Sequence, residues 1–182
     1  QFLGDPLVDA GQLGGLAHEE SPASGALGEL AEHVLPRAVA EPRAQAARQA
    51  LAEDMGCPTW LGLLMHFPMP LRGLQFAIEG LEQVEWRETI GNGIVERVPA
   101  GVVVAITPWN FPLHQIVAKV AAAIGAGCSV ILKPSEVAPG AAQLFMEAVH
   151  ACGLPVGVVN MVWGGASVGE QLTTHPQVDR IS

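Results

Sequence analysis

The stretch that decides the fold spans residues 101–139 and reads GVVVAITPWNFPLHQIVAKVAAAIGAGCSVILKPSEVAP. Its apolar run at 102–106 is continuous, as is typical of parallel strands that are buried on both faces. Apolar residues at helical spacing then predict a helix over 114–124. A second short apolar run predicts a buried strand over 129–132. This order of strand, helix and strand indicates a βαβ unit.

The same order recurs toward the C-terminus. We predict a helix over 140–150, a strand over 156–162, a short helix over 169–173 and the start of a fourth strand over 178–182. Two βαβ units in series predict an α/β fold with a doubly wound parallel sheet and right-handed crossovers. We expect an incomplete Rossmann-like sheet, because the sequence as written stops at its fourth strand.

The residues before this sheet show a different sequence pattern. Pro and Gly punctuation predicts helices over 25–34, 43–55 and 71–84, and a Gly-Asn-Gly turn predicts a hairpin over 88–98. We therefore expect three parts, which are a lead-in over 1–40, helices and a hairpin over 41–98, and the first part of a cofactor-binding domain over 99–182.

Composition excludes several classes of protein. The chain has 9 basic and 18 acidic residues, a net charge of −9, so it lacks the basic footprint of a nucleic-acid binder. Its apolar runs are too short to span a membrane, and its first 15 residues lack the pattern of a secretory leader. Cys57, Cys128 and Cys152 are widely spaced, so we expect a reducing cytoplasm with neither disulfides nor a metal site.

Three polar or glycine-rich loops follow the predicted strands, at 107–112, 133–136 and 164–169. Open parallel sheets bind ligands beyond the carboxyl ends of their strands, so these loops form one candidate site. Each loop also has a plain structural interpretation. The prolines around Trp109 and Asn110 suit a rigid turn, Lys133 and Glu136 suit a solvated pair at a helix start, and GGxxxG is not a nucleotide-binding fingerprint by itself.

Two segments of the sequence resemble the aldehyde dehydrogenase superfamily. They are the opening stretch, with its PWNFP and KPSE elements, and residues 151–182, which read ACGLPVGVVNMVWGGASVGEQLTTHPQVDRIS. The AEDMGCP run at 52–58 also fits the family. The resemblance covers roughly residues 50–182, whereas residues 1–40 match poorly.

The resemblance implies oxidation of a small-molecule aldehyde to a carboxylic acid. In that family a cysteine thiolate attacks the aldehyde, hydride passes to a nicotinamide cofactor, and water hydrolyses the thioester. The Asn of PWNFP, here Asn110, stabilises the oxyanion, a role that suits a neutral and firmly placed amide. Lys119 matches a family lysine near the general base, although it also fits a half-buried surface lysine.

The resemblance also assigns a cofactor cleft. Lys133 and Glu136 of KPSE would hold the adenine-side ribose, and the Glu136 carboxylate would repel a 2′-phosphate, which favours NAD over NADP. Gly165 and Gly169 would let the backbone approach the adenosine. The other residues assigned to this cleft are Ile106, Thr107, Pro108, Trp109 and Ser135.

The family's substrate channel would involve Phe111, His114, Gln115 and Ala118. Two polar groups and one small one suggest a roomy, wet channel that suits aldehydes with a ring or a polar group. The alternative is that His114 and Gln115 face solvent. We expect the complete enzyme to be a homo-oligomer that binds neither nucleic acid nor membrane.

The sequence departs from the family by lacking the nucleophilic Cys, the general-base Glu and the second glycine-bearing turn. Cys57, Cys128 and Cys152 sit at helix ends or at a strand start, so each is interpreted as a packing residue. We therefore expect the 182 residues alone to be inactive. The alternative functions are a non-catalytic nucleotide-binding fragment and a structural remnant.

Overall fold

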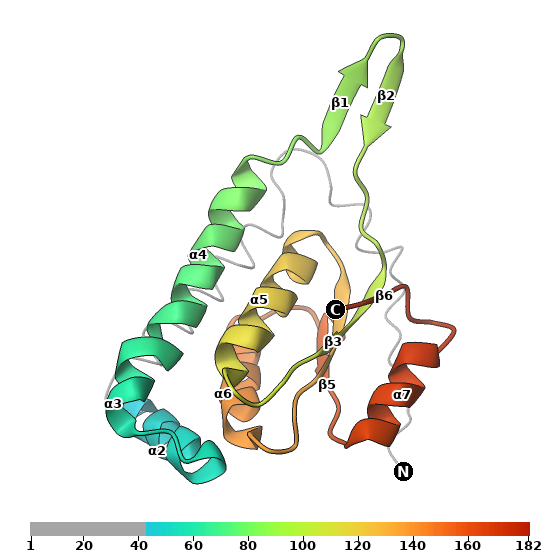
Figure 1. Cartoon of the computed structure of the whole chain (residues 1–182). Coiled ribbons are helices and arrows are strands. Elements are labelled where there is room, and N and C mark those ends of the chain that lie inside the picture. The colour runs from blue at the N-terminus through green and yellow to red at the C-terminus, as the bar shows by residue number, and fades with distance from the viewer. Residues whose placement is uncertain (1–42) are drawn as a thin grey trace.

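A computed structural model describes residues 43–182 of the chain (Figure 1). The lead-in predicted over 1–40 and the helix predicted over 25–34 lie outside the described residues. The described elements are α2 (Arg43–Met55), α3 (Thr59–Leu61), η3 (Gly62–His66), α4 (Pro68–Glu82), β1 (Arg87–Ile90), β2 (Gly93–Glu96), β3 (Val102–Ile106), α5 (Pro112–Gly125), β4 (Ser129–Lys133), α6 (Pro139–Ala151), β5 (Val159–Met161), α7 (Ala166–Thr174) and β6 (Arg180–Ile181).

The sheet has four strands in the order β5-β4-β3-β6, and each neighbouring pair is parallel. Val104 of β3 pairs with Ile131 on one side and with Ile181 on the other. The chain thus moves outward from β3 to β4 and β5, then returns to place β6 beside β3. The predicted α/β fold with a parallel sheet is confirmed, and the order reverses between β3 and β6, where open sheets bind ligands.

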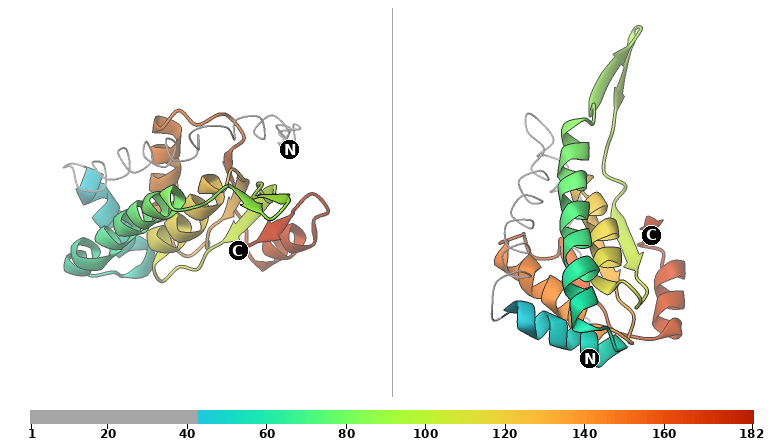
Figure 2. Two further views of the ribbon diagram at one scale, coloured as in Figure 1. Left: turned by 90° about the horizontal axis from the view of Figure 1, so that it is seen from above. Right: turned by 60° about the vertical axis from the view of Figure 1, so that its left-hand side comes forward.

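Helices cover the sheet in layers (Figures 1 and 2). Helices α5 and α6 lie on one side of the sheet and α7 lies on the other, as right-handed crossovers require when the strand order reverses after β5. Helix α4 packs along α5 as an outer layer, with Leu74 fully buried. Gly73 faces α5 at this contact, since a Cβ atom placed on it would lie 3.7 Å from Val117 Cγ1, an ordinary packing distance.

The core joins the sheet to the helices on both sides of the predicted boundary at residue 98. Strand residues such as Val103 and Leu132 pack with Ile116 of α5, while Leu51 of α2 and Leu74 of α4 belong to the same cluster. The continuous apolar runs of β3 and β4 therefore form strands because both of their faces are covered.

The hairpin β1–β2 projects away from the body of the molecule (Figure 1). Gly91 opens its turn with φ +61°, a conformation that favours glycine and suits tight hairpins. An ion pair between Arg87 and Glu96 at 3.4 Å bridges its two strands, and Arg97, directly after β2, pairs with Glu88 of β1 at 3.8 Å. The predicted hairpin is confirmed, and it exposes Ile90 and other apolar side chains.

Several predicted bounds were wrong. The strand predicted over 156–162 is only Val159–Met161, because Val158 N–H donates to Pro155 O at 3.2 Å and closes a turn. The fourth strand is shortened by a similar bond from Val178 N–H to His175 O at 3.1 Å. The last helix is longer than predicted and spans Ala166–Thr174.

No periodic pattern in the sequence assigns the segment between α2 and α4. It forms the short helix α3 and the π-helical turn η3, in which Phe67 N–H donates to Gly62 O at 3.2 Å. Helix α4 starts at Pro68, three residues earlier than predicted. Proline is tolerated in the first turn of a helix, where its missing N–H would have no helical partner.

Candidate functional site

The three loops after the strands meet at the carboxyl edge of the sheet, as predicted. Thr107 N–H donates to Lys133 O at 3.1 Å, which ties the first loop to the second. The third loop lies against the second loop and the end of β3, since a Cβ atom placed on Gly169 would lie 3.6 Å from Lys133 Cε and 4.0 Å from Ile106 Cδ1. These residues therefore share one site.

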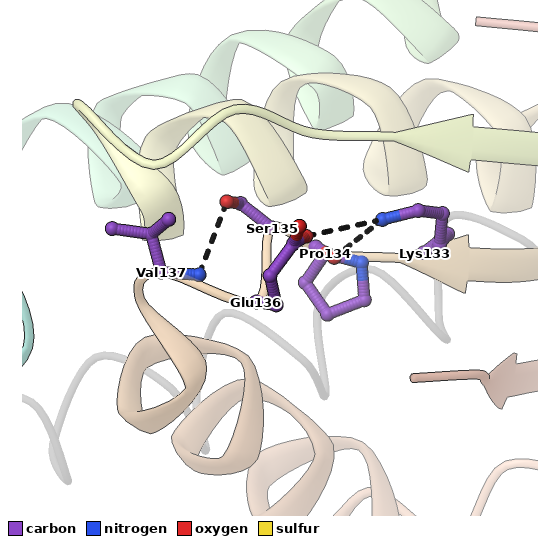
Figure 3. A network of polar contacts seen from close by, with 5 residues as sticks. All are labelled: Lys133, Pro134, Ser135, Glu136 and Val137. Atoms are coloured by element: carbon purple, nitrogen blue, oxygen red, sulfur yellow. Dashed lines mark hydrogen bonds and ion pairs between the residues drawn. The ribbon is translucent and has the colours of Figure 1, made fainter. Parts of the chain in front are cut away.

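Lys133 is the charged group at the centre of this edge. It ends β4 and is only 5% exposed. Its ammonium donates to Pro134 O at 3.1 Å and lies 3.8 Å from Glu136 Oε2 (Figure 3). The plain interpretation of a solvated pair is wrong for Lys133, because its side chain is buried. An ammonium has three donors, so it retains capacity for a ligand oxygen.

Glu136 is the exposed partner of this pair. Its side chain is 60% exposed, against 6% for Lys133. The turn that carries it is fixed by Ser135, whose Oγ accepts a hydrogen bond from Val137 N–H at 3.2 Å (Figure 3). A Cβ atom placed on Gly165 would lie 3.5 Å from Glu136 Oε1. The carboxylate thus stands between its own loop and the start of α7, where it is able to accept hydrogen bonds from hydroxyl groups.

The start of α7 adds backbone donors. Gly165 is its N-cap and supplies no side-chain hydrogen bond, so the first N–H groups of the helix lack a side-chain cap. Gly169 is buried one turn later, beside Lys133. A helix N-terminus and a buried ammonium together suit a ligand that carries both hydroxyl groups and negative charge.

The turn from β3 to α5 forms the other half of the site. Thr107 is only 3% exposed, and its Oγ1 is buried with no hydrogen-bond partner among the described residues. Pro108, Trp109 and Asn110 follow it at the surface. The Asn110 amide therefore reaches solvent at the edge where Lys133 and Glu136 lie, and it is free to donate to a bound ligand.

Helix α5 carries the remaining predicted site residues. His114 and Gln115 are half-buried in its first turns, and Ala118 is exposed. His114 Nδ1 is buried without a hydrogen-bond partner within residues 43–182. Lys119 is half-buried, and no ion pair in the described part of the chain involves it. The structure thus places these residues on one helix without linking Lys119 to the charged pair at Lys133.

The three cysteines differ in burial and in their contacts. Cys57 and Cys128 are buried, and Cys152 donates from Sγ to Ala148 O at 3.1 Å. Burial raises the pKa of the Cys57 thiol, which opposes formation of a nucleophilic thiolate. Among the described residues, no cluster of three His, Cys, Asp or Glu side chains has the arrangement of a metal site.

Sequence reasoning missed two contacts, one made by His66 beside the site and one made by Asp179 at the amino end of β3, on the opposite edge of the sheet. His66, at the end of η3, stacks on Phe111 with ring centroids 4.7 Å apart and planes 11° apart. Asp179 accepts a hydrogen bond from Val102 N–H at 2.8 Å, and Gly101 leaves room for its carboxylate. Only the position of His66 within an apolar run hinted at burial, and no local pattern links Asp179 to β3.

Comparisons with known proteins agree on one family. The profile of the aldehyde dehydrogenase family matches residues 36–182. A 3-succinoylsemialdehyde-pyridine dehydrogenase of Pseudomonas sp. is 45% identical over 136 residues, which cover 74% of this chain and 28% of the relative. The chain thus spans less than a third of that relative's length.

Solved structures show the same similarity. A mutant of aldehyde dehydrogenase C from Pseudomonas syringae, complexed with NAD+ and octanal, matches with a TM-score of 0.84 and 36% identity, over 94% of this chain and 35% of that one. An NADP-dependent enzyme of E. coli matches with a TM-score of 0.79 and 27% identity, over 91% and 34%. Separately, none of the helices within residues 43–182 has the length and apolar character that a bilayer crossing requires.

Proposed function

Because this chain belongs to the aldehyde dehydrogenase family, we propose that the protein carrying it oxidises an aldehyde to a carboxylic acid with NAD. One observation supports this proposal above the others. The buried Lys133, the Glu136 carboxylate and the glycines of the α7 start converge beside the turn that presents Asn110. A site for a nucleotide and a site for a polarised oxygen thus lie at one edge of the sheet.

The residues at this edge fit a dinucleotide. Glu136 accepts hydrogen bonds from ribose hydroxyls, Lys133 donates to a ligand oxygen, and Gly165 and Gly169 leave backbone space beside them. The bound nicotinamide supplies the hydride acceptor for the reaction. We propose NAD rather than NADP, because the Glu136 carboxylate repels a phosphate on the ribose 2′ oxygen. The similar solved structures include both an NAD+ complex and an NADP-dependent enzyme.

Asn110 is proposed to stabilise the reacting oxygen. When a nucleophile attacks an aldehyde carbon, the carbonyl oxygen gains negative charge, and a fixed donor lowers the energy of that state. The Asn110 amide is a neutral donor, exposed at the site and flanked by two prolines that restrict its backbone. We infer that the attacking thiolate belongs to a cysteine other than Cys57, Cys128 and Cys152, and we place Lys119 near the general base.

The proposed substrates are aldehydes with a ring or a polar group. Phe111, His114, Gln115 and Ala118 lie on or just before α5, and they offer an aromatic face, polar atoms and a small side chain. The relative at 45% identity is named for a pyridine-bearing semialdehyde, which agrees with such a pocket. A neighbour crystallised with octanal shows that a long alkyl chain also fits this fold.

We also propose that the protein forms a homo-oligomer and works in the cytoplasm. The projecting hairpin exposes Ile90 and Ile94, and exposed apolar strand residues favour association. Cysteine thiols that form no disulfide within the described residues suit a reducing compartment. Light scattering after size-exclusion chromatography tests the first point, since a monomeric protein would contradict it.

Formation of NADH by the purified protein with a panel of aldehydes tests the central proposal. We expect oxidation with NAD that is abolished by thiol alkylation, because the proposed nucleophile is a cysteine. Titration with NAD is the accompanying measurement. If NAD binds but no aldehyde is oxidised, the protein is a nucleotide-binding module rather than a dehydrogenase.

A further inference from the structure

We propose that His66 is a positioning residue that holds the turn bearing Asn110 in place by stacking on Phe111. The inference rests on the proposed function, since it assigns His66 to the support of the oxyanion donor. Phe111 directly follows Asn110 and directly precedes α5. A group that fixes the Phe111 ring therefore restrains the backbone from which the Asn110 amide projects.

The contact between the two rings has the geometry of a stack. Their centroids are 4.7 Å apart, and their planes differ by only 11°. His66 is 3% exposed, although it lies on the surface segment between α2 and α4. Burial lowers the pKa of the His66 imidazole. The ring is accordingly neutral at pH 7, which suits a face-to-face contact with an apolar ring.

The π-helical turn explains how His66 comes to face Phe111. In η3 the hydrogen bond from Phe67 N–H to Gly62 O spans five residues instead of four. The extra residue rotates the side chains that follow it, relative to a regular α-helix, and such turns often occur at functional sites. Leu63 and Leu64 remain exposed, whereas His66 is directed into the protein.

Besides Pro108 and Pro112, two backbone hydrogen bonds restrain the turn. Its start is tied by the bond from Thr107 N–H to Lys133 O, and its end by the bond from Gln115 N–H to Phe111 O at 2.9 Å. Between these points Trp109 and Asn110 are exposed, and the Asn110 side chain makes no hydrogen bond within the described residues. Among the hydrogen bonds, ion pairs and ring contacts of the described residues, the His66 stack is the one that engages a side chain of residues 108–111.

Two substitutions separate the stack from the imidazole itself. His66→Ala removes the ring, and His66→Phe keeps an aromatic ring that is able to stack but carries no nitrogen. His150→Ala is the matched control, since His150 is exposed in the last turn of α6 and contacts neither Phe111 nor Asn110. The measurements are kcat, the KM for NAD, and hydrogen–deuterium exchange of the backbone over 107–111, all on the protein that carries this chain.

We expect His66→Ala to lower kcat by roughly one to two powers of ten, because a small misplacement of a reacting group has costs of this order. The KM for NAD should stay within about twofold, since Lys133 and Glu136 are untouched. Exchange over 107–111 should accelerate, whereas exchange over β4 should not. His66→Phe should restore both kcat and slow exchange, and His150→Ala should change neither.

The proposal is overturned if His66→Ala leaves kcat or the exchange over 107–111 unchanged, or if His66→Phe is as impaired as His66→Ala. A general rise of exchange across β4 would likewise overturn it, because His66 would then support the whole fold. If the unmodified protein oxidises no aldehyde, the proposed function fails. If the unmodified protein oxidises aldehydes but His66→Ala leaves the exchange over 107–111 unchanged, only the role of His66 is contradicted.

Discussion

The Asp54 carboxylate accepts a hydrogen bond from Gly140 N–H at 2.7 Å, across 86 residues of sequence. Asp54 lies near the end of α2, and Gly140 lies in the first turn of α6. The local N-cap of α6, Ala138, has no side chain able to cap the helix. A carboxylate from another helix therefore satisfies an N–H group at the positive end of α6.

We predict that Asp54→Ala lowers the free energy of unfolding by about 1 kcal/mol, the typical cost of a lost helix cap. Asp54→Asn should cost less, because its amide oxygen still accepts the bond. Urea denaturation measures both changes. Glu53→Ala is the control, since its exposed carboxylate bonds only to Gln49 within the described residues, and it should change stability by less than about 0.5 kcal/mol. Equal losses for Asp54→Ala and Glu53→Ala would contradict the capping role.

Gly140 was predicted only as the start of a helix, and its contact with Asp54 was not predicted. Sequence periodicity reports the face that an element buries, so it located β3, β4 and α5 to within two residues. The shared edge of the three loops followed from the rule that parallel strands end on the same side. Contacts between distant residues depend on packing between helices, about which local patterns carry no information.

The position of the candidate site was predictable to the same degree. Lys133, Glu136 and Gly169 were recognised because motif residues after strands share an edge, and the structure brings them together. The stack of His66 on Phe111 was not predictable, because the π-helical turn breaks the helical period that would have oriented His66. The roles of these residues and the boundaries at 40 and 98 remain predictions.

Glu136 is predicted to set the choice of cofactor. The protein should have a higher kcat/KM with NAD than with NADP. Glu136→Gln should reduce the ratio of the two kcat/KM values about tenfold, which is the effect of removing about 1.4 kcal/mol of like-charge repulsion. Steady-state kinetics with both cofactors measures this ratio. Glu147→Gln, an exposed carboxylate on α6, should leave it unchanged. An equal or reversed preference in the unmodified protein would remove the role assigned to Glu136.

Asn110 is predicted to act in turnover and not in cofactor binding. Loss of one oxyanion donor typically lowers kcat by about two to three powers of ten. Asn110→Ala should therefore lower kcat by this amount and leave the Kd for NAD nearly unchanged. Steady-state kinetics measures kcat, and titration with NAD measures the Kd. A variant with full turnover would refute the role. If Asn110→Ala instead melts well below the unmodified protein, Asn110 serves the turn between Pro108 and Pro112.

Ala118 and His114 are predicted to contact the substrate. Ala118→Trp should reduce kcat/KM for ring-bearing aldehydes relative to short alkyl ones by about tenfold, the usual effect of filling a substrate pocket. His114→Leu should weaken selection of polar substrates, because it removes the buried Nδ1 that lacks a partner within the described residues. Ala122→Trp, an exposed position one turn further along α5, is the control. An unchanged ranking of substrates in both variants would show that these side chains face solvent.

His66 is predicted to make the stability of the protein depend on pH. Burial lowers the pKa of its imidazole in the folded state below the ordinary value of about 6.5, which applies when the chain is unfolded. Between the lowered folded pKa and about 6.5, the unfolded chain therefore binds protons more readily than the folded chain. The contribution of a neutral His66 to the free energy of unfolding is fully present above pH about 6.5. This contribution is lost as the pH falls through the lowered folded pKa.

The melting temperature should accordingly fall between pH 7 and pH 5, a range above the ordinary titration of carboxylates. His66→Phe should flatten this fall, because phenylalanine keeps the contact with Phe111 and binds no proton. Calorimetric scans across the range measure both slopes. His150→Phe should retain the slope of the unmodified protein, since His150 is exposed. If His66→Phe and the unmodified protein lose stability in parallel, the group that senses pH is not His66.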